Sequence, residues 1–178
     1  MMFLQALIYG VNLLRNKLYQ FKILSQQSFN IPIVSIGNVS MGGTGKTPMV
    51  AWLCQELMQS DIKPCIITRG YNRKNSDMII VHPNKKNKYV LDDMGDEPFD
   101  LLKKLPGISM VVHNHKSDAI KAAINVLDID VIILDDGFQS LYINRDLDIV
   151  LLNHKNKYIY NREPYNCLKR ADVVVFND

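Results

Sequence analysis

The sequence predicts an α/β fold in which a mostly parallel β-sheet is flanked by helices. Short apolar runs typical of buried strands alternate along the chain with longer segments of helical periodicity. A glycine-rich turn joins the first of these runs to a helix, which is the arrangement of a phosphate-binding loop. The chain has 178 residues, of which 47% are hydrophobic and 22% charged, so it can form one domain with a substantial core.

The composition excludes some classes of function. A net charge of +3 is too small to indicate a nucleic-acid-binding surface. Cys54, Cys65 and Cys167 are odd in number, far apart and without the spacing of metal ligands. They are expected to be buried, small apolar residues in a protein of a reducing compartment.

Residues 1–24 predict an amphipathic helix. Its apolar stripe consists of Leu4, Leu7, Ile8, Val11, Leu14 and Leu18. Arg15, Lys17 and Lys22 follow the apolar part, as in a helix that lies at a membrane surface. The segment is too short to span a bilayer and lacks the features of a secretory signal. Two interpretations stay open, namely a membrane-surface anchor and a helix packed on the protein's own core.

The phosphate-binding loop follows the apolar run that begins at Ile33. The predicted nucleotide-binding residues are Ser40, Met41, Gly42, Gly43, Thr44, Gly45, Lys46 and Thr47. Lys46 would reach the β- and γ-phosphates, and the Thr47 hydroxyl would bind Mg²⁺. Ser40 stands where the G-x-x-x-x-G-K-[ST] pattern has its first glycine, so a flexible turn with a solvated lysine is the alternative.

A basic loop comes after the next strand. Met49–Met58 predicts a crossover helix and Pro64–Thr68 a parallel strand, which completes a βαβ unit. The segment from Arg69 to Lys74 then contains two arginines and one lysine. Loops at the carboxyl ends of such strands face the ligand crevice, so this one is a candidate for binding phosphate or an anionic substrate. The alternative is a solvated turn.

Two adjacent carboxylates open a later helix. Before them, Met78–Val81 and Lys88–Leu91 predict an inserted hairpin. Asp96 and Glu97 then begin a helix that runs through Leu105. They either complement the helix dipole, or they serve a reaction in which Glu97 assists Mg²⁺ and Asp96 handles a proton.

The remaining elements bring a further carboxylate pair to a strand end. The expected strands are Ile108–Val112, Val131–Leu134, Asp146–Leu152 and Asp172–Phe176, with a helix at Ser117–Leu127. The strand that ends before Asp135 and Asp136 is fully apolar, and a carboxylate at this place in a P-loop site binds Mg²⁺ directly or through water. His113 and His115 would point to opposite faces of a continuing strand, so a shared metal site is not expected.

In series, these motifs resemble the tetraacyldisaccharide 4′-kinase family, which makes lipid A in Gram-negative bacteria. They are Gly37-Asn38, Gly42–Pro48, Arg69–Tyr71, Gly95–Pro98, Asp135–Gln139 and Arg162–Pro164, and the resemblance covers nearly the whole chain. It implies a kinase core of the P-loop NTPase type at residues 25–178. The implied reaction transfers the γ-phosphoryl group of ATP, with Mg²⁺, to the 4′-hydroxyl of tetraacyldisaccharide 1-phosphate. It also implies that residues 1–24 anchor the enzyme at the cytoplasmic face of the inner membrane.

The resemblance also assigns roles to residues. Asp96 is the expected base toward the sugar hydroxyl, and Lys46 with Mg²⁺ neutralises the γ-phosphoryl group. Glu97 and Thr47 hold the metal, while Asp135 and Asp136 tune the metal and the acceptor side. The candidates for the lipid headgroup are Asn38, Arg69, Tyr71, Gln139, Arg162 and Glu163. No nucleic acid and no obligatory protein partner is implied.

In one respect the sequence departs from this family. Family members continue into a smaller second domain with a histidine motif that can pair with the catalytic aspartate, whereas this sequence ends at Asp178. No histidine here takes that role, so the chain is expected to be either a fragment or a naturally short member, and a truncated or inactive member that binds nucleotide only is one alternative. A partition-type ATPase switch is another, although Met41 replaces its signature lysine and the Asp96-Glu97 pair argues against it.

Overall fold

The computed structural model describes residues 2–40, 43–71, 73–74, 76–83, 91–153 and 163–177. Its elements in chain order are α1 (Met2–Gln20), β1 (Ile33–Asn38), α2 (Lys46–Gln59), β2 (Pro64–Thr68), β3 (Ile79–Val81), α3 (Leu91–Met94), α4 (Asp96–Lys104), β4 (Ser109–Val112), α5 (Lys116–Val126), β5 (Val131–Asp135), β6 (Leu147–Asn153), the 3₁₀-helix η1 (Tyr165–Arg170) and β7 (Val173–Asn177).

The strands form one seven-stranded sheet in the order β3-β4-β2-β5-β1-β6-β7. All neighbours are parallel except β3, which runs antiparallel to β4 at one edge. The strand that leads into the glycine-rich loop, β1, lies between β5 and β6 near the middle. The carboxyl ends of the parallel strands therefore meet at one edge of the sheet, around the end of β1. This arrangement confirms the predicted α/β fold.

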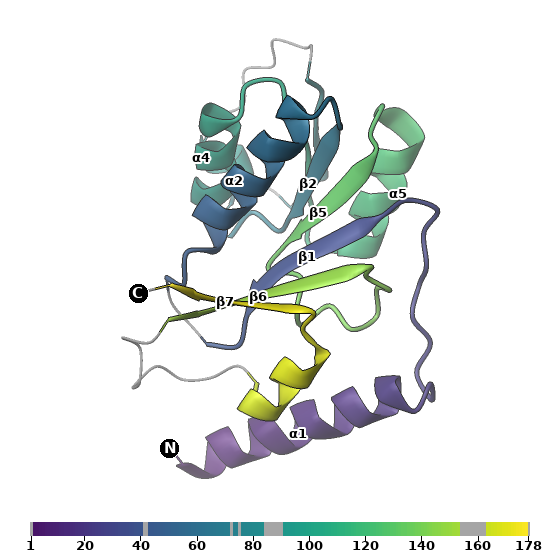
Figure 1. Ribbon diagram of the computed structural model, residues 1–178, viewed down its shortest axis with the longest axis vertical. Coiled ribbons are helices and arrows are strands. Elements are labelled where there is room, and N and C mark those ends of the chain that lie inside the picture. Colours follow the sequence, from purple (N-terminus) through teal and green to yellow (C-terminus); the bar gives the residue numbers. More distant parts are fainter. Residues whose placement is uncertain are drawn as a thin grey trace.

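Helices cover both faces of the sheet (Figure 1). Alternate residues of each central strand point to opposite faces, so Ile66 packs in the core shared with α2 and α4, whereas Cys65 and Ile67 pack toward α5. The predicted burial of the cysteines is confirmed, since Cys54, Cys65 and Cys167 are all free and buried.

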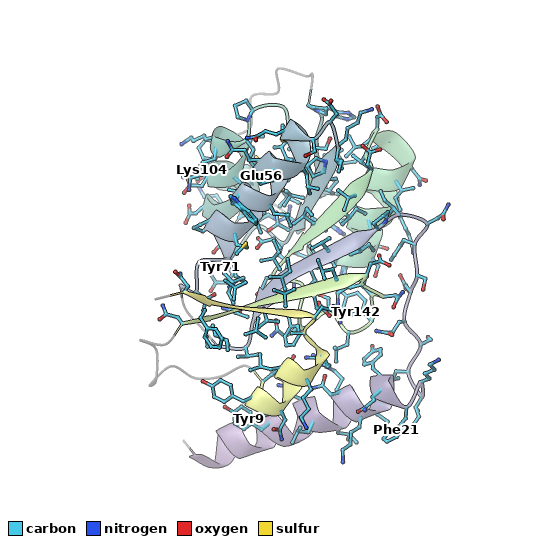
Figure 2. All side chains as sticks on the ribbon, in the orientation of Figure 1. Tyr9, Phe21, Glu56, Tyr71, Lys104 and Tyr142 are labelled. Carbon is cyan, nitrogen blue, oxygen red and sulfur yellow. The ribbon has the colours of Figure 1, made fainter. Side chains whose placement is uncertain are left out.

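The first helix lies along the outside of the molecule, beside η1 (Figure 1). The Asn16 Nδ2 of α1 donates to Cys167 Sγ of η1 at 3.0 Å, so one side of the helix is held to the protein. The opposite side is open to solvent, with Val11 58% and Leu14 60% exposed. Phe21, 69% exposed, follows the end of the helix on the outside of the molecule (Figure 2). Among the described residues, no helix has the length and apolar character needed to cross a membrane.

The predicted hairpin can be followed only in part, and its described residues differ from the expectation. The antiparallel partner of β3 is β4, in a register that pairs Ile79 with Val112 and Val81 with Met110. Residues 88–90 of the expected second strand lie outside the described residues, and Leu91 opens the helix α3 instead. Pairing with β4 buries Val81 against the main core, which a solvent-exposed hairpin would not achieve.

Candidate functional site

The loop between β1 and α2 has the backbone of an anion-binding turn. Gly45 adopts a left-handed conformation with φ of 84° directly before α2, and no side chain caps the start of that helix. The first N–H groups of α2 and the positive end of its dipole therefore point toward the loop. A cavity of about 210 Å³ lies there, lined by Gly43, Thr44, Gly45, Lys46, Thr47, Pro48 and Glu97. Met41 and Gly42, also expected to bind nucleotide, lie outside the described residues, and Ser40 is buried two residues after the end of β1.

A buried hydrogen bond closes this loop onto its own strand. Asn38 Nδ2 at the end of β1 donates to Thr44 Oγ1 at 2.9 Å, and neither residue is more than 1% exposed. Gln139 Nε2 in turn donates to the Asn38 backbone carbonyl at 2.8 Å. The side chain of Asn38 is therefore engaged within the protein, which favours a role in shaping the loop over direct contact with a substrate headgroup.

The last strand also reaches the loop. Asn177 Nδ2, at the end of β7, donates to the Thr44 backbone carbonyl at 3.4 Å. The positive φ of Gly45 favours glycine there, and a Cβ atom at this position would lie 2.7 Å from that nitrogen, so the Asn177 side chain would have to move. Sequence reasoning missed Asn177. The available signal was a polar residue directly after an apolar strand, the pattern that drew attention to Asp135.

Lys46 faces residues 135–140, the carboxylate loop at the end of β5. Its Nζ lies 3.8 Å from Asp136 Oδ1, with the side chains 15% and 31% exposed, respectively. Asp136 itself has a positive φ of 52°, so its backbone is turned sharply out of the strand direction. The structure thus brings together two of the three residues that the sequence proposed as catalytic.

Asp135 is held deeper than Asp136. It is 4% exposed and accepts a hydrogen bond from Thr68 Oγ1 of β2 at 2.9 Å. Burial raises the pKa of its carboxyl group, and the nearby Lys116 and the Thr68 hydroxyl oppose that rise. Asp135 is therefore a residue of the site's interior.

Lys116 is a site residue that sequence reasoning missed. It is fully buried, and its Nζ donates to the backbone carbonyls of Asp135 at 2.6 Å and Asp136 at 2.5 Å. Burial lowers the pKa of this lysine to about 8, and the two aspartates oppose the change. Its position offered a signal, because it shares the inward face of α5 with Ala119, Ile120 and Ala123 at helical spacing.

The acidic start of α4 lies against the basic loop after β2. A Cβ atom at Gly95 would lie 2.5 Å from the Tyr71 backbone oxygen, so the two backbones are in direct contact. Glu97 lines the same cavity as Lys46 and Thr47, and Asp96 precedes it as an exposed residue. A second cavity of about 310 Å³ lies beside this junction, lined by Arg69, Gly70, Tyr71, Arg73, Lys74, Ser76 and Asn114.

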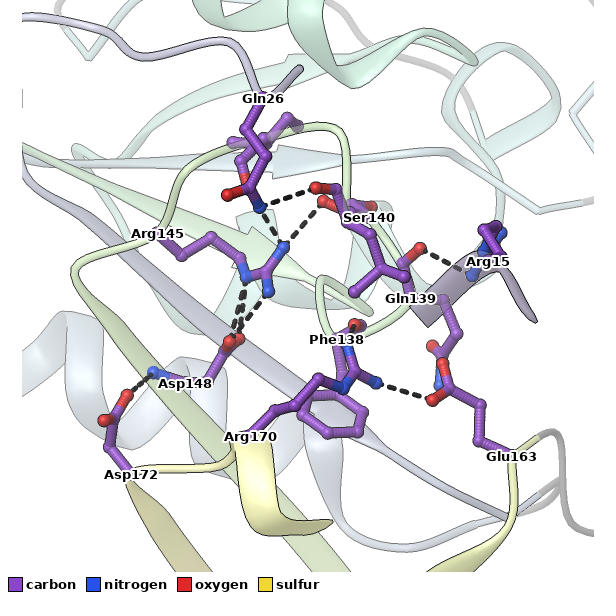
Figure 3. A network of polar contacts seen from close by, with 12 residues as sticks. Arg15, Gln26, Phe138, Gln139, Ser140, Arg145, Asp148, Glu163, Arg170 and Asp172 are labelled. Carbon is purple, nitrogen blue, oxygen red and sulfur yellow. Dashed lines mark hydrogen bonds and ion pairs between the residues drawn. The ribbon is translucent and has the colours of Figure 1, made fainter. Parts of the chain in front are cut away.

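The two headgroup candidates near the chain's end have different outcomes. Arg162 lies outside the described residues. Glu163 is fully buried, and its Oε2 accepts from Arg170 Nη2 at 2.5 Å (Figure 3). The same oxygen accepts from Asn16 Nδ2 at 3.4 Å. Since this carboxylate is committed to η1 and α1, its surroundings favour a structural role.

The oxygen-bearing side chains of this cavity suit a hard divalent cation that also binds the oxygens of a phosphate. No group of three or more histidine, cysteine or acidic side chains is close enough to bind a metal ion in the described part of the chain. Mg²⁺ is usually held by one or two carboxylates together with waters and substrate phosphates, and Thr47 and Glu97 on one cavity fit that pattern. His113 and His115 lie close, with ring centroids 5.7 Å apart, but the Nδ1 of His113 contacts the His115 backbone.

Comparison with known proteins places these features in context. The whole chain, residues 1–178, matches a family described as tetraacyldisaccharide-1-P 4′-kinase. The tetraacyldisaccharide 4′-kinase of Phocaeicola vulgatus is 35% identical over 180 residues, which cover 94% of this chain and 48% of that protein. The enzyme of that name from Aquifex aeolicus is 37% identical over 169 residues, covering 90% of this chain and 52% of that one.

A solved structure agrees over almost the entire chain. A crystal structure of LpxK from Aquifex aeolicus in complex with ATP matches with a TM-score of 0.90 and 34% sequence identity. The match covers 99% of this chain and 57% of that one. The chain thus spans about half the length of the curated relatives it matches.

Proposed function

Because the chain belongs to the tetraacyldisaccharide-1-P 4′-kinase family, we propose that it carries the ATP-binding half of a lipid A 4′-kinase reaction. In that reaction the γ-phosphoryl group of ATP is transferred to the 4′-hydroxyl of a tetraacylated disaccharide 1-phosphate. The observation that carries the proposal is the position of Lys46 at the start of α2, across from Asp136 and on one cavity with Glu97.

In this proposal the phosphates of ATP bind at the start of α2. The backbone N–H groups of the loop and of the first helical turn donate to phosphate oxygens, and Lys46 neutralises the β- and γ-phosphates. The Asn38–Thr44 hydrogen bond keeps the loop in shape before the nucleotide arrives. The site is therefore preorganised, which reduces the entropy lost on binding.

Mg²⁺ would be held by the Thr47 hydroxyl and Glu97, with Asp135 and Asp136 nearby. The ion would supply charge neutralisation for the transferring phosphoryl group. Lys46 shares that task, because it lines the same cavity.

The acceptor side is proposed to involve the loop after β2 and the start of α4. Asp96 accepts the proton of the 4′-hydroxyl as the new P–O bond forms and the bond to the leaving ADP oxygen breaks. Tyr71, whose backbone contacts the start of α4, and Arg69 in the same loop are exposed and available to an anionic headgroup. Phosphoryl transfer depends mainly on positioning and on charge neutralisation, and the groups named here would provide both.

The first helix is proposed to bring this site to the cytoplasmic surface of the inner membrane. Its open side presents Val11 and Leu14, and Phe21 follows at its end, all more than half exposed. Lys17 follows Leu14 and Lys22 follows Phe21, which is the composition of a helix that lies in a membrane interface.

The test is transfer of radiolabelled γ-phosphate from ATP to tetraacyldisaccharide 1-phosphate in detergent micelles. The chain is assayed alone and after fusion to the second half of a relative. Transfer by either form should be lost in Asp96→Ala and retained in Asp100→Ala, an exposed carboxylate on the same helix. Transfer that survives Asp96→Ala would refute the assigned base. If neither form transfers phosphate, ATP binding by titration calorimetry decides whether the chain binds nucleotide only.

A further inference from the structure

The carboxylate loop is held in place by hydrogen bonds to its backbone carbonyls. Every backbone carbonyl from Asp135 to Ser140 accepts a hydrogen bond, and basic side chains supply most of the donors. Lys116 donates to Asp135 and Asp136, the Ser140 N–H to Gly137, Arg170 to Phe138, Arg15 to Gln139 and Arg145 to Ser140. The basic side chains come from four separate segments, three of which are visible in Figure 3.

Arg15 is the member that comes from α1. Its Nη2 donates to the Gln139 backbone carbonyl at 3.2 Å, across 124 residues of sequence. The side chain of Gln139 holds the Asn38 carbonyl at 2.8 Å, and the side chain of Asn38 holds the Thr44 hydroxyl at 2.9 Å. Three successive hydrogen bonds thus connect the first helix to the phosphate-binding loop, through groups that are buried or partly buried.

We propose that Arg15 is a positioning residue of the nucleotide site. By fixing the backbone at Gln139 it fixes the reach of that side chain to Asn38, and so the shape of the loop at Thr44. It also holds the segment that carries Asp136 opposite Lys46. The inference rests on the proposed function, because it concerns the same nucleotide site, and it gives α1 a task there besides any contact with membrane.

A simple role in attaching α1 does not account for this contact. The helix has a second attachment one residue away, where Asn16 Nδ2 donates to Cys167 Sγ at 3.0 Å and to Glu163 Oε2 at 3.4 Å. Loss of the Arg15 side chain leaves those bonds in place. Its specific effect therefore falls on the carboxylate loop, where the Gln139 carbonyl loses a charge-assisted donor.

The first experiment needs no ligand. Hydrogen–deuterium exchange is measured over residues 136–140 in the wild type, Arg15→Ala, Arg15→Lys and Lys17→Ala. Arg15→Ala should speed exchange in this segment about tenfold, because its local opening becomes easier. Arg15→Lys keeps a donor and should restore most of the protection, and Lys17→Ala, an exposed lysine on the same helix, should change nothing there. Unchanged exchange in Arg15→Ala would overturn the proposal.

The second experiment asks whether the effect runs through Gln139. The Kd for ATP with Mg²⁺ is measured by calorimetry for Arg15→Ala, Gln139→Ala and the double variant. Each single change should weaken binding roughly tenfold, and the double variant should be no weaker than either single one, since both break the same connection. The proposal would be contradicted if the losses in ATP affinity of the two single variants multiply in the double variant. It would also be contradicted if Arg15→Lys loses as much affinity as Arg15→Ala. If the wild type binds no ATP, the proposed function is refuted. The exchange measurement would still show whether Arg15 stabilises the carboxylate loop.

Discussion

Replacing Lys46 by methionine separates its structural contribution from its contribution to binding. The substitution keeps the aliphatic stem and removes the charge that lies 3.8 Å from Asp136 Oδ1. Both side chains are partly exposed, so the ion pair is worth roughly 0.2–1 kcal/mol of stability after screening by solvent. A hydrogen bond from the same ammonium to a phosphate is worth roughly 1.5–3 kcal/mol. Loss of that hydrogen bond corresponds to a factor of about 10 to 150 in the Kd for ATP.

The assay combines urea denaturation with calorimetric titration of ATP. Lys46→Met should bind ATP at least about tenfold more weakly while its free energy of unfolding falls by less than about 1 kcal/mol. Lys63→Met is the matched control, because Lys63 forms an exposed ion pair with Asp128 on a different part of the surface. It should leave the Kd unchanged. Wild-type ATP affinity in Lys46→Met would show that the loop is not a phosphate site, and a large loss of stability would show that Lys46 is a structural residue.

Three further outcomes are expected. Arg170→Met should lower the free energy of unfolding by about 3 kcal/mol, because it leaves the buried Glu163 carboxylate without its cationic partner; adding Glu163→Gln should recover part of the loss in urea denaturation. Burial lowers the pKa of Lys116 to about 8 while the unfolded chain keeps the usual 10.5, so between these values the unfolded state binds more protons and stability rises with pH. The rise in unfolding free energy from pH 7.5 to 9.5 should be smaller in Lys116→Met, and an equal rise would contradict the assignment. Burial raises the pKa of the Cys54 thiol to about 12 and that of Cys167 to about 11, so alkylation at pH 8 should be slow until urea unfolds the protein. Rapid labelling of the folded protein, followed by mass spectrometry, would show that these thiols are accessible.

Much of the fold could be predicted because its central strands are short, apolar and separated by clear helical segments. The predicted strand Pro64–Thr68 has those bounds in the structure, and all five of its residues are buried. The edge of the sheet was harder. The residues of β3 are equally compatible with a local hairpin and with pairing to β4, and only the tertiary contact of Val81 with the core decides between them.

The candidate site also contains residues that could be predicted from the sequence and residues that could not. The glycine-rich loop and the Asp135-Asp136 pair follow from local pattern, since a strand end determines where those residues go. Burial and side-chain pairing do not follow from local pattern. Glu163 reads as a polar loop residue, yet it is sealed by Arg170 from η1 and Asn16 from α1. The helical spacing of Lys116 places it on the inward face of α5, but nothing local identifies its partners, the carbonyls at the end of β5.

The place of β1 in the sheet has a consequence for synthesis of the protein. Both neighbours of this strand are translated much later, since Ile33 pairs with Ile132 of β5 and Val34 with Leu147 of β6. At roughly 5–20 residues per second, a ribosome needs about 5–20 s to supply the first of these partners. During that interval the apolar strand β1 lacks its neighbours in the sheet. In that state it can be bound by chaperones or pair with other strands. The phosphate-binding loop, which also contacts Asn177, is therefore encoded early and is among the last features to reach its final form.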